Sequence, residues 1–277
     1  MSTEKTGDLP KTVLLRHQGS EFDKDVISRW LADGTDMVAE LVIEPDYRRK
    51  LGTLRHEYQR NGPVGLLDAL TFHLYYRYRL SGSEHEKIRS LTDDIGGRYP
   101  DHQVETYSIK DPNSKRTVSL LHKLDPDLML ARCRILLDER VFSTPEHGTF
   151  VLHPGICPEY RNQHGCFWAL ANGDDTKVGY SLLRIDEGID TGEIYAQNGT
   201  AFNPKEDEHI YIQLKTVAEN LGEVGDVLRS VHRGTAAPVD TTGRKSAVWG
   251  MPKLSAWATW KRRVHKFDID HVNSSVN

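Results

Sequence analysis

The fold is indicated by one stretch near the start of the chain, residues 12–46, which reads TVLLRHQGSEFDKDVISRWLADGTDMVAELVIEPD. Residues 12–15 form a short apolar, β-branched run, which is typical of a buried parallel strand. Residues 23–31 repeat apolar side chains at helical spacing, and residues 37–43 form a second apolar run. This succession predicts a right-handed crossover in a mostly parallel sheet, so we expect an α/β, Rossmann-like fold. The first turn has only Gly19 and lacks the GxGxxG pattern, so a nicotinamide cofactor is not supported.

The next part of the chain interrupts this pattern. Residues 46–80 are basic and rich in aromatic side chains, a mixture that nucleic-acid surfaces also show. Their apolar residues recur at helical spacing, so we interpret the stretch as a helical insertion that packs on the core. We expect the insertion to extend to about residue 97, with a polar, turn-rich part over residues 81–97. The α/β pattern then resumes. We expect a strand at residues 104–108, a short helix at residues 118–124 and a further strand at residues 128–133.

The overall composition narrows the class of protein. The 277 residues suffice for a globular core, and a formal net charge of −4 with interspersed acids and bases favours no nucleic-acid and no membrane partner. Three cysteines without framework spacing predict free thiols in a reducing compartment. The polar residues 1–11 do not resemble a signal peptide. We therefore expect a cytoplasmic protein with a small-molecule partner.

The residues that indicate a chemistry lie in residues 149–197, TFVLHPGICPEYRNQHGCFWALANGDDTKVGYSLLRIDEGIDTGEIYAQ. A strand at the start of this stretch places His153 at its carboxyl end, where open α/β sheets bind ligands. A loop and a short helix at residues 166–172 follow, and a strand at residues 178–185 leads into an acidic loop. A carboxylate beside an imidazole is the pairing that poises a general base. Three carboxylates of that loop are placed to approach the histidine: Asp186, Glu187 and Asp190.

This stretch resembles the folate-dependent formyltransferases, a family that includes methionyl-tRNA, glycinamide ribonucleotide and sugar N-formyltransferases. The family pattern runs NxHPSLLPxYRG, then a helix that ends in NGD, then DEGxDTG. The corresponding stretches here are VLHPGICPEYR at 151–161, NGD at 172–174 and DEGIDTG at 186–192. The resemblance implies a formyltransferase fold and the transfer of a formyl group from 10-formyltetrahydrofolate to an amine. It also implies that His153 is the catalytic histidine and that Asp190 holds it.

The resemblance further assigns the two sides of the site. The formyl donor is expected against the loop before the histidine strand and against the acidic loop, held mainly by backbone groups. These donor residues are Arg134, Ile135, Leu136, Asp186, Glu187 and Gly188. Substrate contacts are expected at Gly155, Ile156, Arg161, Asn162 and His164. Gly155 and Ile156 replace the serine and the first leucine of the family pattern, which changes the shape of this loop.

The chain departs from the family pattern two residues before the histidine. The family has an asparagine there that helps to hold the formyl oxygen, whereas this chain has Val151, which cannot donate a hydrogen bond. Loss of one oxyanion donor commonly costs about 10² to 10³ in turnover. Arg161, Asn162 and His164 are candidates to replace the donor, with turn and capping roles as the alternative. Two rival functions keep the fold: a formyl-folate hydrolase, and a non-catalytic or repurposed binding protein.

Other chemistries fit the sequence less well. The histidines and cysteines of this region lack the short repeated spacing of a zinc site, so we expect no metal. No serine stands in a nucleophile elbow. Cys157 follows His153 in the same loop, but without a clear base partner we expect an inert thiol.

The C-terminal part completes the expected organisation. We expect a formyltransferase-like domain over residues 1–200, and a C-terminal helix and extension packed on it over residues 201–277. A long amphipathic helix is predicted over residues 210–228. The tail is too short for the tRNA-binding barrel of the methionyl-tRNA branch, so the resemblance favours a small amine acceptor: an amino sugar, an amino acid or a biosynthetic intermediate. We expect the tryptophans of the tail to anchor it to the domain, with an acceptor-binding role as the alternative: Trp249, Trp257 and Trp260. A homodimer is a possible assembly.

Overall fold

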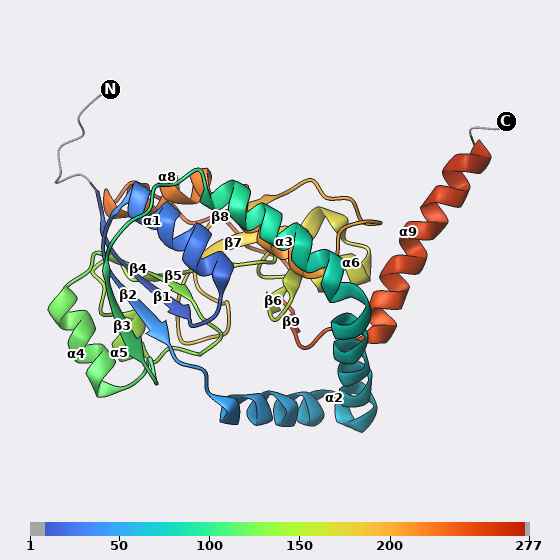
Figure 1. Ribbon diagram of the computed structural model, residues 1–277, viewed down its shortest axis with the longest axis horizontal. Coiled ribbons are helices and arrows are strands. Elements are labelled where there is room, and N and C mark those ends of the chain that lie inside the picture. Colours follow the sequence, from blue (N-terminus) through green and yellow to red (C-terminus); the bar gives the residue numbers. More distant parts are fainter. Residues whose placement is uncertain (1–8, 275–277) are drawn as a thin grey trace.

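The computed structural model describes residues 9–274, and within this range a seven-stranded mixed sheet forms the centre of the molecule (Figure 1). Its strands occur in the order β3-β2-β1-β4-β5-β7-β8. The first five are parallel, and β5, β7 and β8 pair antiparallel. Their bounds are β1 (Lys11–His17), β2 (Asp36–Ile43), β3 (Glu105–Ile109), β4 (Leu128–Arg132), β5 (Thr149–His153), β7 (Gly179–Arg184) and β8 (Ile194–Gly199). The α/β fold predicted from residues 12–46 is confirmed.

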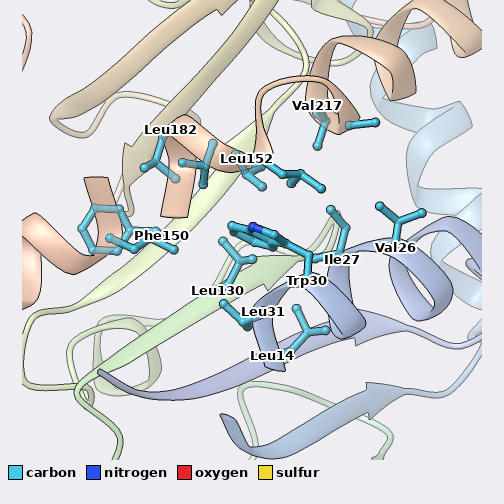
Figure 2. Close-up of a cluster of buried hydrophobic side chains, with 14 of the residues drawn as sticks. Leu14, Val26, Ile27, Trp30, Leu31, Leu130, Phe150, Leu152, Leu182 and Val217 are labelled. Atoms are coloured by element: carbon cyan, nitrogen blue, oxygen red, sulfur yellow. The ribbon is translucent and has the colours of Figure 1, made fainter. Parts of the chain in front are cut away.

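Helices cover both faces of the sheet. One face carries η1 (Asp23–Ser28), α1 (Arg29–Gly34), α3 (Ser81–Gly96), α7 (His209–Ala218) and α8 (Leu221–His232). The other carries α4 (Lys115–Leu124) and α5 (Glu139–Phe142). Strand residues alternate between the two faces, so Leu14 packs with Trp30 in one apolar cluster (Figure 2), while Val13 and Leu15 belong to the other.

The insertion after β2 is helical throughout. It consists of α2 (Tyr47–Tyr75), η2 (Tyr76–Leu80) and α3. Within α2, Gly62 adopts a φ of 66°, and the following Pro63 cannot continue the hydrogen-bond ladder, so the helix is sharply kinked. The prediction of a turn-rich stretch at residues 81–97 was wrong, because this part of the chain forms α3. A few buried positions, among them Ile95, suffice to hold this largely polar helix on the core.

The C-terminal part differs from the single long helix that we predicted. Helices α7 and α8 are separate, because the Asn220 amide donates to the carbonyl oxygens of Thr216 and Gly199, at 2.7 and 3.2 Å, where α7 ends. The chain then returns to the loop after β5 and forms a two-stranded sheet of β6 (Arg161–Asn162) and β9 (Val248–Trp249).

The last helix, α9 (Leu254–Ser274), runs beside the second half of α2 and extends beyond the sheet (Figure 1). It also packs on α6 (Gly165–Asn172), which is followed by the short η3 (Asp175–Lys177). None of the helices in residues 9–274 has the length and apolar character that crossing a bilayer requires.

Candidate active site

His153 lies at the carboxyl end of β5 and is only 4% exposed. Its strand is fixed between parallel β4 and antiparallel β7. Phe150 and Leu152 point into the apolar cluster of Figure 2. Because strand residues alternate, Val151 and His153 share the opposite face of the sheet.

Both ring nitrogens of His153 face hydrogen-bond acceptors. Nδ1 lies 3.4 Å from Oδ2 of Asp190, and Nε2 lies 2.7 Å from the carbonyl oxygen of Tyr160. A carbonyl can only accept, so Nε2 must donate, and the carboxylate favours a proton on Nδ1 as well. The surroundings of the ring therefore suit the doubly protonated imidazolium.

The electrostatics of the site agree with this geometry. Burial by itself lowers the pKa of His153, but electrostatic interactions with Cys157 and Asp190 and hydrogen bonds to Cys157 and the Tyr160 carbonyl outweigh it. The pKa of His153 is raised from 6.5 to about 9. At neutral pH the side chain is thus a cation that can donate a proton or a hydrogen bond.

The acidic loop is shaped to bring Asp190 to the histidine. Asp190 has a φ of 50°, in the left-handed region that aspartate tolerates, and its Oδ2 accepts the backbone N–H of Asn162 at 2.7 Å. Asp186 Oδ1 accepts from the Gly188 N–H at 3.0 Å and from the Thr191 hydroxyl at 2.6 Å. A Cβ on Gly188 would lie 1.9 Å from that hydroxyl oxygen, so the turn requires glycine. The DEGIDTG motif therefore has a local structural reason.

The loop after His153 is packed closely around Gly155. A Cβ at this position would lie 2.7 Å from Nε2 of His153 and 2.8 Å from both the Gly165 Cα and the Tyr160 carbonyl oxygen. No larger residue fits unless the backbone moves. This explains a glycine where the formyltransferase pattern has serine. The adjacent Ile156, also expected at the substrate side, is buried, at 8% exposed.

The position of the family's asparagine is apolar. Val151 packs against Cys157, Leu183 and Ile194. Of the proposed replacement donors, the Asn162 amide donates to the Trp249 carbonyl at 2.6 Å. Arg161 donates from Nη1 to the Ile189 carbonyl at 3.2 Å, and its buried Nε has no hydrogen-bond partner. Arg161 therefore has a donor to spare beside the acidic loop, whereas the Asn162 amide is engaged by the C-terminal segment.

His164 packs on His209 of α7, a histidine that the helical insertion also contacts. Its ring centroid is 5.6 Å from that of His209 in α7, and Phe72 and Tyr76 of the insertion also contact His209. Burial, with a contribution from the positive charge of Arg134, lowers the pKa of His164 to about 3. Its buried Nδ1 has no hydrogen-bond partner. His164 is thus a neutral side chain at the boundary between the site and the insertion.

The expected donor residues lie on two loops. Backbone groups hold the first of these: the Arg134 N–H donates to His17 at 3.2 Å, and the Leu136 carbonyl accepts from Asn113 at 2.9 Å. Ile135 packs on the core together with Ile185. A cavity of about 520 Å³ lies beside the second loop and includes Asp186 and Glu187 of the expected set. The rest of its lining is Glu139, Phe142, Ser143, Pro145, Glu146, Gly148, Arg184, Ile185 and residues 191–193.

Sequence reasoning missed the groups that come from distant parts of the chain. Tyr160 contributes through its backbone carbonyl, which side-chain identity does not reveal. Arg244 and Trp249 contact the loop after His153 from more than 80 positions away, and no local pattern marks them. Among residues 9–274, no three histidine, cysteine, aspartate or glutamate side chains gather as ligands for a metal ion.

The model of the formyl transferase family matches residues 83–221, which is half of the chain. These residues include the histidine strand, its loop and the acidic loop. The chain belongs to the formyl transferase family. It is thus a formyltransferase-family enzyme by descent, and its sheet has the formyltransferase fold.

Curated proteins and solved structures agree with this assignment. A methionyl-tRNA formyltransferase from Sorangium cellulosum is 36% identical over 158 residues, which are 55% of this chain and 48% of that protein. The chain spans about half or less of the length of the methionyl-tRNA formyltransferases that it matches. A sugar N-formyltransferase from a Shewanella species has the same fold, with a TM-score of 0.55, 14% identity, and coverage of 92% of this chain and 87% of that chain. Glycinamide ribonucleotide transformylase 1 from Symbiobacterium toebii gives a TM-score of 0.54 at 13% identity, with coverage of 87% and 100%.

Within this formyl transferase family, the chain keeps the histidine and the aspartate of the motif and brings them together, while valine replaces the asparagine. The histidine also has a partner within its own loop, the Tyr160 carbonyl. The histidine and the aspartate of the motif thus lie together, and the position of the pattern's asparagine is apolar.

Proposed function

We propose that this enzyme transfers the formyl group of 10-formyltetrahydrofolate to the amine of a small-molecule acceptor, with His153 and Asp190 as its catalytic pair. The observation that carries the proposal is the placement of His153 between the Asp190 carboxylate and the Tyr160 carbonyl. Formyl transfer requires a group that stabilises negative charge on the formyl oxygen and returns a proton to the leaving nitrogen. An imidazolium supplies both.

The role of each residue follows from its contacts. Asp190 holds Nδ1 and stabilises the charged ring, so the proton on Nε2 is the one that can be given away. The Tyr160 carbonyl orients that N–H, and a reacting oxygen or nitrogen would compete with this carbonyl for it. As the acceptor amine attacks the formyl carbon, Nε2–H would donate to the developing oxyanion. The same proton would pass to the leaving nitrogen as the C–N bond breaks, and the neutral Nε2 would then take up the proton that the acceptor nitrogen loses, which restores the imidazolium.

The residues present fit a folate on the acidic-loop side. The bound folate would supply the formyl carbon in an activated form. Phe142 and Ile185 offer apolar surface in the 520 Å³ cavity, while Asp186 and Glu187 offer acceptors for the N–H groups of a pterin ring. We therefore retain Arg134, Ile135, Leu136, Asp186, Glu187 and Gly188 as the proposed donor residues.

The acceptor is proposed to be a small amine such as an amino sugar, an amino acid or a biosynthetic intermediate. Relatives and structural neighbours are named for tRNA, glycinamide ribonucleotide and sugar acceptors, so the family alone does not select among them. The altered loop, with Gly155, Ile156 and Arg161, is where we expect the acceptor to contact the enzyme. The acidic character of the chain as a whole, at net charge −4, favours an acceptor without a large phosphate backbone.

Calorimetric titration with a stable formyl-tetrahydrofolate analogue tests the donor, and formyl transfer to a panel of amino sugars, amino acids and methionyl-tRNA tests the acceptor. We expect micromolar binding, and a loss of turnover of about 10²-fold or more in His153→Ala with donor affinity preserved. His122→Ala, which changes an exposed histidine on α4, is the matched control. Absence of binding up to millimolar analogue would refute a folate donor. Formate release that is independent of any amine would instead identify a formyl-folate hydrolase, as the apolar Val151 position allows.

A further inference from the structure

The C-terminal segment 244–251, which we call the strap, lies across the loop that follows His153. Arg244 donates from Nε and Nη2 to both carboxylate oxygens of Glu159, at 3.0 and 2.6 Å. Its Nη2 also donates to the Cys157 carbonyl, and its Nη1 to Gln197 Oε1, each at 2.8 Å. The Arg244 side chain is 21% exposed and that of Glu159 18%. A guanidinium thus binds the loop through a two-point contact with a carboxylate and a further contact with a carbonyl.

The backbone of the strap continues this contact. The Ala247 N–H donates to the Pro158 carbonyl and the Ala247 carbonyl accepts from the Arg161 N–H, both at 3.1 Å. Strands β6 and β9 then pair in parallel, with Arg161 opposite Val248 and Asn162 opposite Trp249. Each residue of the loop from 157 to 162, except Tyr160, is therefore held by a hydrogen bond or a strand pairing to the strap.

Tyr160 is held by its ring instead. The Trp249 ring lies between the rings of Tyr160 and Trp168, with centroid distances of 5.7 and 4.9 Å and interplanar angles of 18° and 25°. Trp249 Nε1 donates to the Glu159 carbonyl at 2.9 Å, and Trp168 Nε1 donates to the Gly250 carbonyl at 2.9 Å. Stacking on both faces of one tryptophan fixes the strap and the loop in a single arrangement.

This arrangement determines the surroundings of His153. The acceptor for Nε2 is the Tyr160 carbonyl, which lies between Glu159 and Arg161, two residues that the strap binds. The Asp190 carboxylate, which faces Nδ1, is bound by the N–H of Asn162, the second residue of β6. Both partners of the imidazole thus depend on the strap, which lies outside the residues that the family model matches.

We propose that Arg244 is a positioning residue for formyl transfer: through Glu159 and the Cys157 carbonyl, the strap holds the loop so that Tyr160 and Asp190 face the two nitrogens of His153. The proposal rests on the proposed function of His153. It makes the C-terminal segment a required part of this enzyme's active site. The strap also contacts the insertion, because Glu57 accepts from the Met251 N–H at 3.4 Å and Arg60 donates to the Val248 carbonyl.

The titration of His153, followed by NMR of isotope-labelled histidine in the intact protein, tests the placement directly and needs neither donor nor acceptor. We expect Arg244→Ala to lower the pKa of His153 by at least about one unit, because Asp190 and the Tyr160 carbonyl move away from the ring. Arg244→Lys should have a smaller effect, since it keeps a charge beside Glu159 but not the forked contact. Arg98→Ala, which breaks the exposed pair between Arg98, just beyond α3, and Asp94 of α3, is the control and should leave the titration unchanged.

Kinetics and chemical rescue complete the test. Arg244→Ala should lower kcat by about 10- to 100-fold with KM changed by less than about threefold, because misplaced catalytic groups affect turnover more than binding. Added guanidinium at non-denaturing concentration should restore part of kcat in Arg244→Ala and nothing in wild type. If Arg244→Ala does not fold, Trp249→Phe, which keeps the stacking and loses the bond to the Glu159 carbonyl, should show the same shift in smaller degree. A folded Arg244→Ala or Trp249→Phe with the wild-type His153 titration would overturn the proposal. This result is independent of donor binding, so it is distinguishable from failure of the proposed function.

Discussion

At the scale of single residues, the site depends on which acceptors surround one imidazole. The ring of His153 is buried, a condition that normally favours the neutral form, yet a carboxylate and a carbonyl face its two nitrogens. The interactions with these acceptors outweigh the effect of burial and raise the pKa of His153, because a charge-assisted hydrogen bond is roughly twice as strong as a neutral one. The same crowding fixes Gly155, whose missing side chain leaves the space that the ring and the Tyr160 carbonyl occupy.

Asp190→Asn should remove the carboxylate's share of the charge stabilisation while preserving the loop, because asparagine also tolerates the left-handed φ of 50°. We expect the pKa of His153 to fall clearly below its value of about 9, and turnover to fall by about 10²-fold or more. NMR titration and steady-state kinetics measure the two effects. A variant that keeps the raised pKa would show that Asp190 is not what stabilises the imidazolium.

Gly155→Ser, which restores the residue of the family pattern, should destabilise this protein by about 1–3 kcal/mol, because the new Cβ would overlap His153, Gly165 and Tyr160. Urea unfolding measures the loss. Gly222→Ala, at a helix position with no neighbouring atom within 4 Å, is the control and should be neutral or slightly stabilising. Equal stability of the two variants would mean that the loop relaxes at no cost.

At the scale of elements, the C-terminal segments are joined to the body through their tryptophans. Trp260 of α9 is 1% exposed, and Trp257 donates to Glu208 at 3.1 Å and packs on Tyr75 at a centroid distance of 5.0 Å. Trp249 is enclosed by Tyr160 and Trp168. These contacts agree with the anchoring role that we favoured from the sequence. They also connect α9 and the insertion to α6, the helix that follows the loop after His153.

Trp260→Ala should cost about 3–5 kcal/mol in the free energy of unfolding, because it leaves a large cavity between α6 and α9. The measurement is chemical denaturation of the full chain. Tyr78→Ala, an aromatic deletion at a side chain that is 76% exposed, should change stability by less than about 0.5 kcal/mol. A small effect at Trp260 would indicate that α9 contributes little to the stability of the body.

At the scale of the whole molecule, buried histidines should lower the free energy of unfolding both at acidic and at alkaline pH. Burial, His164 and Lys261 lower the pKa of His209, and burial and Arg134 lower that of His164 to about 3. These two rings stay neutral in the folded protein, but they take up protons near pH 6.5 when it unfolds. His153 behaves oppositely, because its pKa is higher in the folded protein than in the unfolded chain.

Stability contributed by the neutral pair His164 and His209 is fully present above pH 6.5 and lost as the pH falls from 6.5 toward 3. We expect a decrease of up to about 1.4 kcal/mol per pH unit for each histidine, measured by urea unfolding between pH 7 and pH 5. The double variant His164→Asn, His209→Phe should show a shallower slope, since asparagine tolerates the φ of 53° at 164 and aromatic rings surround 209. His122→Ala should keep the wild-type slope, and an equal slope in all three proteins would exclude this pair as the cause.

At high pH the sign is reversed, and His153 is the group concerned. Its folded-state pKa of about 9 exceeds the unfolded value of 6.5, so its stabilising contribution is fully present below pH 6.5 and lost as the pH rises through about 9. We expect the melting temperature to fall between pH 7 and pH 10 in wild type, and to fall less in Asp190→Asn. Parallel curves for the two proteins in a calorimeter would contradict this account.

The sequence by itself determined the central fold, and it selected two residues, His153 and Asp190, that the structure places side by side. Short apolar runs with amphipathic helical segments between them predicted the parallel strands, because a strand that is buried on both faces is apolar at every position. Spaced motifs selected His153 and Asp190. Sequence reasoning was wrong where helices are mostly polar or are interrupted by a single side chain, as in α3 and at Asn220. Only the tertiary structure decided which other groups surround His153 and its loop: the Tyr160 carbonyl, and the strap with Arg244 and Trp249. The packing of His164 on His209 was also decided there. The physical reason is that backbone acceptors and contacts across 80 or more positions arise from how the elements pack, and no short-range period in the sequence encodes them.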